Sequence, residues 1–244
     1  MSGHSKWSTI KHKKGAADAK RGKLFTKLSR AILVAAKEGG PDPATNMALA
    51  NAVEKARSYS MPKDNIDRAI AKGSGEGTDG AMFETVVYEG YGPEGVAVIV
   101  EALTDNRNRT AADVRHLFSK HGGNLGATGA VAWQFERRGI VLVPADGVDE
   151  DELFLAVADA GADDIERDGS VFQISSAPDQ LSAVRQAVES AELSMVPKVT
   201  VAIGDESTAK RVVHLVEGLE DNDDVQDVYA NFDIPESVLE AVAS

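Results

Sequence analysis

The glycine-rich stretch from Gly73 to Gly80 constrains the fold more than any other feature, because the sequence changes character there. Before it, apolar residues recur at helical spacing, and after it β-rich runs alternate with helical ones. The stretch reads GSGEGTDG, which is typical of a linker. Its literal GxGxxG lacks the preceding strand and following helix that a dinucleotide site requires. We therefore predict a helical domain over residues 1–75 and a linker over 76–80.

The segment before the linker carries three predicted helices. One side of residues 20–37 bears apolar residues at spacings of four, four and three: Leu24, Leu28, Ile32 and Ala35. A second helix is expected over 46–59. A third begins near Pro62, since proline is favoured in the first turn of a helix. Three helices joined by short loops predict a small bundle.

The segment from Gly3 to Arg30 is strongly cationic, with nine Lys and Arg residues against one acid, Asp18. The whole chain, by contrast, has a formal net charge of −13. Residues 1–75 hold 15 Lys and Arg against 6 Asp and Glu, a net of +9, and the remaining residues hold 11 against 33, a net of −22. Because such asymmetry is typical of proteins that contact polyphosphates, we predict a nucleic-acid partner for the basic segment.

The predicted contact residues all come from this segment, whose first part forms a basic arm that we expect to order on its partner. Lysine and arginine would neutralise phosphates, and aromatic rings would stack on bases. Trp7 has a second interpretation as an anchor that pins the arm to the helices behind it, and both stay open. The predicted residues are Lys6, Trp7, Lys11, His12, Lys13, Lys14, Lys20, Arg21, Lys23, Lys27 and Arg30.

A second candidate anion patch consists of Arg107 and Arg109. The two arginines precede a helix that we expect to begin at Thr110, where Thr110 and Asp113 have capping-box spacing. Guanidinium groups beside a helix N-terminus can hold an anion together with free backbone N–H groups. The alternative is that both arginines pair with carboxylates of their own domain, and the sequence favours neither.

The sequence after the linker predicts two mixed domains. Residues 83–91 and 95–103 form a predicted hairpin, followed by the helix from Thr110 and a strand over 130–135. The stretch 136–204 has the element order βαββαβ, with strands expected over 139–144 and 198–203 and a helix over 179–191, which is the ferredoxin-like pattern. A last helix at 208–219 and a strand at 225–233 lack a unit of their own.

We therefore expect the end of the chain to complete the first of these sheets. The predicted fold class is α+β with three domains: an N-terminal helical bundle with a basic arm, followed by two ferredoxin-like α/β domains, one inserted in the other. Residues 81–135 plus 205–244 form the first α/β domain and residues 136–204 form the inserted one.

Several classes of function lack support in the sequence. The chain has no cysteine, HExxH, GxSxG or P-loop motif, so we expect no catalytic residues, no metal site and no cofactor. The acidic runs at 149–152 and 220–224 are expected to be solvated. No apolar run is long enough to span a membrane and no secretory h-region occurs, so we predict a cytoplasmic protein without a membrane partner. A monomer is favoured.

Several long motifs resemble the YebC family of bacterial and organellar proteins over essentially the full length. These motifs are GHSKW at 3–7, IKHKKGAADAKRGKLFTKL at 10–28, MPKDNI at 61–66, YEGYGPEGVA at 88–97, TDNRNRTAADVRHLFSKHGGNLG at 104–126 and MVPK at 195–198. The resemblance implies an N-terminal helical domain, two α/β domains and no cofactor. It also implies a role in gene expression, either as a DNA-binding transcriptional regulator or as a translation factor on the ribosome that helps with consecutive prolines.

The leading hypothesis is a non-enzymatic nucleic-acid-binding regulator whose partner is DNA or ribosomal RNA, the latter within the ribosome. Lysine-rich contacts suit phosphates more than base edges, which favours RNA recognised by shape and charge, whereas descriptions of the family more often name DNA. Two alternatives belong to other classes. One is a protein–protein adaptor that uses the acidic domains, and the other is an enzyme that uses a cleft between the α/β domains.

Overall fold

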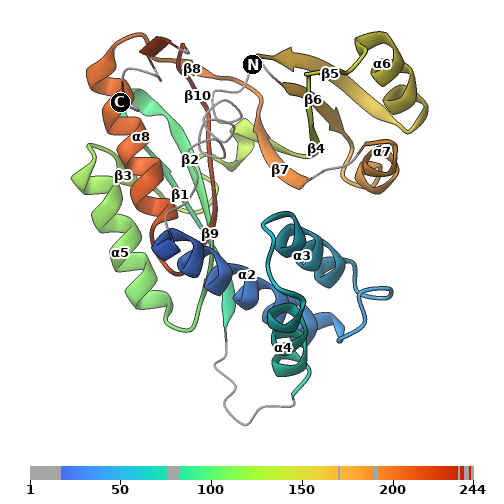
Figure 1. The fold of residues 1–244 in the computed structure, drawn as a ribbon. Coiled ribbons are helices and arrows are strands. Elements are labelled where there is room, and N and C mark those ends of the chain that lie inside the picture. The colour runs from blue at the N-terminus through green and yellow to red at the C-terminus, as the bar shows by residue number, and fades with distance from the viewer. Residues whose placement is uncertain are drawn as a thin grey trace.

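The computed structural model describes residues 18–75, 83–169, 171–188 and 192–235, with residues 237, 238 and 242 near the end of the chain. These residues form helices and mostly antiparallel strands, which confirms the α+β class. Figure 1 shows the helical part below and two sheets above it. Among the described residues, no helix combines the length and apolar character needed to cross a lipid bilayer.

The three predicted N-terminal helices are confirmed. They are α2 (Asp18–Gly39), α3 (Met47–Ser58) and α4 (Lys63–Gly73). Their apolar stripes meet in one core, formed mainly by Leu28, Ile32, Leu49, Val53, Ile66 and Ala69. Gly73 lies so close to α2 that a Cβ atom would overlap the backbone oxygen of Leu33. The absence of a side chain there lets α4 pack directly on α2.

The first sheet contains β1 (Glu84–Tyr91), β2 (Ala97–Thr104), β3 (Asn124–Leu125) and β9 (Val225–Ala230), in the order β3-β1-β2-β9. The predicted hairpin is confirmed, because β1 and β2 pair antiparallel around the short helix η1 (Pro93–Gly95). Glu94 and Gly95 both have positive φ, at 57° and 77°. That conformation turns the chain tightly enough for the two strands to meet.

Two helices, α5 (Arg107–Lys120) and α8 (Glu206–Glu220), cover one face of the first sheet (Figure 1). The alternation along β2 sends Val96, Val98 and Val100 into the core beneath these helices. The intervening Ala97 and Ile99 are buried on the opposite face, with residues that include Phe135. Strand β2 is therefore covered on both faces, and it forms the centre of the molecule.

The second sheet contains β4 (Phe135–Pro144), β5 (Ala162–Asp168), β6 (Val171–Ser176) and β7 (Glu192–Pro197), with helices α6 (Glu150–Asp159) and α7 (Leu181–Ala187). Its strand order is β5-β6-β4-β7 and all neighbours are antiparallel. The element order βαββαβ matches the ferredoxin-like pattern. Val141, Phe172 and Ile174 lie at the centre of its core.

The chain then returns to the first sheet. Strand β9 pairs with β2, and β10 (Phe232–Asp233) pairs in parallel with β8 (Val201–Ala202). The pairing of β9 with β2 is the reason to keep the division into residues 81–135 plus 205–244 and an inserted 136–204 as our proposal for the domains. The first sheet differs in connection from the second, since its first two strands are joined by a hairpin.

Several predicted elements were wrong in extent, three of them in or beside the second sheet. The strand expected at 130–135 is a loop that ends in the short helix η2 (Ala132–Gln134), because a buried carboxylate takes the backbone N–H groups of Val131 and Ala132. The strand expected at 198–203 as the last of the βαββαβ unit is only the two-residue β8, which pairs with β10, since the N–H of Lys198 bonds to Gln134. The last strand of the unit is instead β7, which was not predicted from the sequence. The helix expected at 179–191 is the shorter α7.

Candidate functional site

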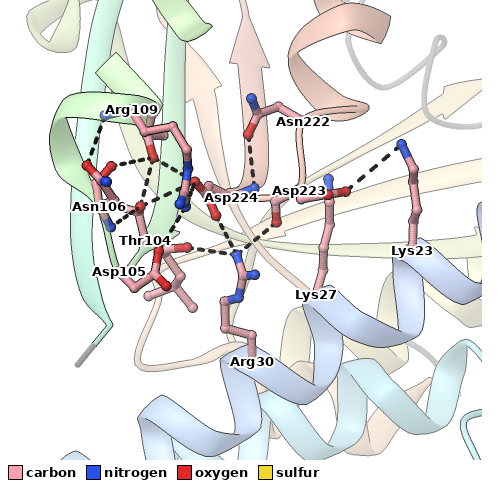
Figure 2. Close-up of polar contacts among 12 residues, drawn as sticks. Lys23, Lys27, Arg30, Thr104, Asp105, Asn106, Arg109, Asn222, Asp223 and Asp224 are labelled. Atoms are coloured by element: carbon pink, nitrogen blue, oxygen red, sulfur yellow. Dashed lines mark hydrogen bonds and ion pairs between the residues drawn. The ribbon is translucent and has the colours of Figure 1, made fainter. Parts of the chain in front are cut away.

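Three basic side chains of α2 point toward one acidic loop. Lys23, Lys27 and Arg30 follow one another at spacings of four and three, so they lie on one face of the helix. Figure 2 shows all three directed at the loop that follows α8, which carries Asp223 and Asp224. The predicted row of cations on one face of the helix is therefore present along this part of α2, but these side chains contact carboxylate and backbone oxygens of the same chain.

Arg30 is the most deeply engaged of the three. Its Nη1 donates to Oδ1 of Asp224 at 2.9 Å and to the backbone oxygen of Asp223 at 2.9 Å. The same nitrogen lies 3.1 Å from the backbone oxygen of Leu103 at the end of β2. The guanidinium also lies over the ring of Phe83, 4.7 Å from its centroid, as in a cation–π contact. Arg30 thus joins the helical domain to the first sheet.

The engagement weakens toward the N-terminal end of α2. Lys27 is half-buried and its Nζ donates to the backbone oxygen of Glu220. Lys23 is exposed, and its Nζ lies 3.9 Å from the carboxylate of Asp223. An exposed pair at that distance contributes little to stability. The side chain nearest the basic arm is therefore the one most available to an external anion.

Asp224 is the centre of the junction. It is only 5% exposed, and its Oδ2 accepts hydrogen bonds from the Arg109 guanidinium at 2.9 Å and the Thr110 hydroxyl at 2.7 Å. The Thr104 hydroxyl lies 3.2 Å from the same oxygen. Burial raises the pKa of Asp224, but the hydrogen bonds from Arg109 and Thr110 and the charges of Arg109 and Arg30 lower it further, so the net shift is downward. The expectation that the whole 220–224 run is solvated is therefore wrong for this residue.

The start of α5 differs from the prediction and explains how Asp224 obtains its partners. The N-cap is Asn106, whose side chain accepts the N–H of Arg109 at 3.1 Å, so the helix begins before Thr110. The Thr110 hydroxyl is consequently free of a capping role. It bonds to Asp224 and, at 2.7 Å, to the hydroxyl of Thr104. The capping box expected at Thr110 and Asp113 was therefore wrong, because Asn106 supplies the cap.

The two arginines of the second candidate patch have different surroundings. Arg109 pairs with Asp105 at 2.8 Å and with Asp224 at 2.9 Å, which is the internal pairing that the sequence left open. Arg107 is exposed, and its Nη1 lies 3.9 Å from the carboxylate of Glu84. Of the two, Arg107 is the residue whose charge is less committed within the protein. The anion patch at Arg107 and Arg109 stays a prediction.

A second contact joins the helical domain to the same sheet. Lys55 of α3 lies 2.6 Å from the carboxylate of Asp227 on β9. Asp227 is paired in register with Glu101 on β2. Burial and the charge of Asp227 raise the pKa of Glu101, and the charges of Arg137 and Lys55 offset part of the rise. The helical domain is therefore held to the sheet by ion pairs from two of its helices.

The structure treats the predicted site residues unequally. Lys6, Trp7, Lys11, His12, Lys13 and Lys14 lie outside the described residues, and so do the side chains of Lys20 and Arg21 in α2. Arg30 and Arg109, which the sequence assigned to separate patches, meet at Asp224. Sequence reasoning missed Asp224 and Thr104, and no local signal distinguishes Asp224 from its acidic neighbours. Within the described ranges, no group of three or more His, Asp or Glu side chains could hold a metal ion.

Comparison with known families gives matches along most of the chain. A profile described as "TACO1/YebC protein N-terminal domain" matches residues 5–76. A second, described as "TACO1/YebC second and third domain", matches residues 83–232. The gap between the two matches falls on the predicted linker.

Individual relatives are similar over the full length. A protein of Rubrobacter xylanophilus is 59% identical over 100% of both chains, and one of Desulfotalea psychrophila is 53% identical over 100% of both. Both are named "Probable transcriptional regulatory protein". A crystal structure of a conserved hypothetical protein from Aquifex aeolicus is 50% identical, with a TM-score of 0.80, and the match covers 90% of this chain and 93% of that one.

Proposed function

The chain belongs to the TACO1/YebC family, and we propose that it is a non-enzymatic regulator of gene expression that binds nucleic acid through its basic N-terminal segment. One observation carries the proposal: nine Lys and Arg residues against one acid over residues 3–30, in a chain whose net charge is −13. Neutralising phosphates and releasing their counterions is the main source of affinity in such complexes.

The geometry of α2 supports a division of the basic residues into two roles. We propose that Lys27 and Arg30 fix the helix against the loop around Asp224, and that phosphate contacts come from the cations between Lys6 and Lys23. Carboxylates at the loop would repel a phosphate backbone that continued further along α2. The nucleic acid would then lie over the N-terminal end of the helix and along the arm.

Two partners fit this charge distribution. We favour structured RNA, including that of the ribosome, because lysine-rich contacts suit phosphates and shape more than base edges. Duplex DNA is the second candidate, and the names of the relatives favour it. We place the protein in the cytoplasm as a monomer, without a cofactor. An adaptor role for the acidic domains and an enzyme using the cleft between them are the competing proposals.

The experiment that tests this function replaces Lys11, Lys13 and Lys14 by Ala and measures binding to a structured RNA and to a DNA duplex over a range of salt. We expect weaker binding and a slope of log K against log salt that is shallower by about 0.7–0.9 for each phosphate that the variant no longer neutralises. The preferred partner is the one whose affinity falls more.

The control removes the same charge from elsewhere in the helical domain. Lys37, Lys63 and Lys72 are exposed lysines of α2 and α4, and their triple replacement by Ala should change the slope much less. Equal reductions in affinity in the two triple variants would show that binding depends on the net charge of the helical domain and not on a specific site in the arm. Unchanged affinity in the first variant would remove the arm from the interface and favour the adaptor.

A further inference from the structure

Trp133 is the largest exposed apolar side chain in the described part of the chain. It is 68% exposed at the end of the loop that joins β3 to β4, and Val199, on the segment after β7, is 66% exposed. Large apolar side chains normally leave solvent on folding. A single exposed apolar residue needs no partner, but Trp133 and Val199 together leave apolar surface on two neighbouring segments, which makes this a candidate contact surface.

A buried carboxylate holds this loop in place. Glu89 of β1 is 4% exposed, and its two carboxylate oxygens accept the N–H groups of Gly129 at 2.7 Å and of Val131 and Ala132 at 2.8 Å each. Burial raises the pKa of Glu89, but the three backbone hydrogen bonds lower it by more. The carboxylate therefore stays ionised and keeps the loop fixed at neutral pH.

The indole ring itself is oriented. Its Nε1–H donates to the backbone oxygen of Ala130 at 3.1 Å, and the Tyr91 hydroxyl donates to the same oxygen at 2.9 Å. Ala127, Thr128 and Gly129 in the preceding turn are small and exposed, so they leave room for a flat group to approach. One edge of the ring is thus held by the protein while most of its surface faces solvent.

The segment that carries Val199 is fixed to the same loop. Asn231, only 1% exposed, donates from Nδ2 to the Gln134 side chain and to the backbone oxygen of Val199, each at 3.1 Å. The N–H of Lys198 donates to the backbone oxygen of Gln134 at 2.7 Å. Trp133, Lys198 and Val199 therefore sit on two adjacent segments with little freedom to move apart.

The charge of this surface identifies the kind of partner. Residues 121–135 and 193–204 contain no Asp or Glu, in a chain that has 39 of them, and Lys198 in the second range is exposed. Glu136, directly after the first range, is paired with Arg138 at 3.3 Å. The other exposed apolar pair, Phe154 at 51% and Leu155 at 67%, lies on α6 shortly after the four consecutive acids at 149–152. A phosphate would be repelled at α6 but not at Trp133.

We propose that Trp133 is a stacking platform for an unpaired base, with Lys198 contacting the adjacent phosphate. The proposal rests on the proposed function, because it adds a second contact for the same nucleic acid. A rigid exposed aromatic ring with a nearby cation is the arrangement that binds single strands with little sequence preference. The duplex or folded part would lie on the basic segment, and a single-stranded part would reach Trp133.

The experiment uses the two tryptophans of the chain, Trp7 and Trp133. In full-length Trp7→Phe protein, all tryptophan fluorescence comes from Trp133. We expect short oligouridylate or oligothymidylate to quench this fluorescence, because a stacked base quenches the indole. Inorganic polyphosphate should bind the basic segment without quenching it. Binding is followed in parallel by the anisotropy of a labelled oligonucleotide.

Substitution gives the second readout. Trp133→Ala should weaken single-strand binding about ten-fold, Trp133→Phe should retain part of the affinity, and Phe154→Ala is the matched exposed control that should change nothing. Oligonucleotide binding without quenching, at an affinity that Trp133→Ala leaves unchanged, would overturn the stacking proposal alone and assign the surface to a protein partner. Failure of the unsubstituted protein to bind any oligonucleotide would overturn the proposed function as well.

Discussion

Glu89 and Asp224 are two buried carboxylates at the first sheet, one on β1 and one directly before β9, and their partners differ. Glu89 is 4% exposed and receives three backbone N–H groups from one short loop. Asp224 is 5% exposed and receives two guanidinium groups and two hydroxyls from three separate parts of the chain. The first carboxylate shapes a loop inside one domain, whereas the second holds two domains together.

The comparison shows why the two carboxylates respond to different perturbations. Both have a lowered pKa, because hydrogen bonds outweigh the effect of burial. The partners of Glu89 are backbone N–H groups, which only a proline substitution removes. The partners of Asp224 are side chains, and Arg109 is itself exposed to solvent and salt. The junction at Asp224 can therefore be altered from either side, while the loop at Glu89 depends on one residue.

The largest effect should come from Asp224→Ala. The substitution removes the charged acceptor shared by the half-buried Arg30 and the buried Thr104 and Thr110, so we expect the free energy of unfolding to fall by about 3 kcal/mol. Urea denaturation measures the change. Asp223→Ala, which removes an exposed carboxylate one residue away, should cost less than about 1 kcal/mol. Equal effects would mean that Asp224 does not join the domains.

The second effect should come from Glu89→Gln, at about 2 kcal/mol, because one neutral oxygen replaces a carboxylate that accepts three N–H groups. The folded-state pKa of Glu89 is lowered, so its contribution is complete above the unfolded value of about 4.3 and is lost as the pH falls through the lower folded value. The difference between parent and variant should therefore be largest above pH ~5 and shrink in acid.

Denaturation at several pH values tests this second prediction. Glu84→Gln changes an exposed carboxylate on the same strand, and its small effect should not depend on pH in this way. A constant difference between parent and Glu89→Gln down to low pH would show that the hydrogen bonds to Glu89 do not depend on its charge.

The smallest effect should come from Arg107→Ala. Its guanidinium lies 3.9 Å from Glu84 at an exposed position, so we expect a change in stability within about 0.5 kcal/mol. Arg109→Ala should cost more, since Arg109 contacts the buried Asp224. Thermal unfolding compares the stabilities of the two variants. A larger loss for Arg107→Ala than for Arg109→Ala would contradict the assignment of Arg109 to the junction.

The sequence predicted the elements that depend on local pattern. The stripe through Leu28 and Ile32 and the alternation of Val96, Val98 and Val100 are visible in short windows, because burial of apolar side chains follows the helix and strand periods. The N-terminal helices and the hairpin were therefore predicted close to their observed bounds.

The junction could not be predicted in the same way. The bond from Arg30 to Asp224 spans 194 positions, and the bond from Thr110 to Asp224 spans 114. No periodic pattern links polar residues at such separations. Glu89 was missed for the same reason, since its partners lie 40 to 43 positions later and are backbone groups that any residue would supply. Hydrogen bonds between distant segments emerge only once the fold brings them together.

The position of β9 has a consequence for the order of folding during synthesis. The edge of β2 that β9 covers carries unpaired N–H and C=O groups until Val225–Ala230 have been made, after the whole second sheet. The helical bundle and the second sheet can form first, because each pairs within a continuous stretch of chain. Asp224 immediately precedes β9, so the last strand of the first sheet to be made also brings the carboxylate that binds Arg30 of the helical domain.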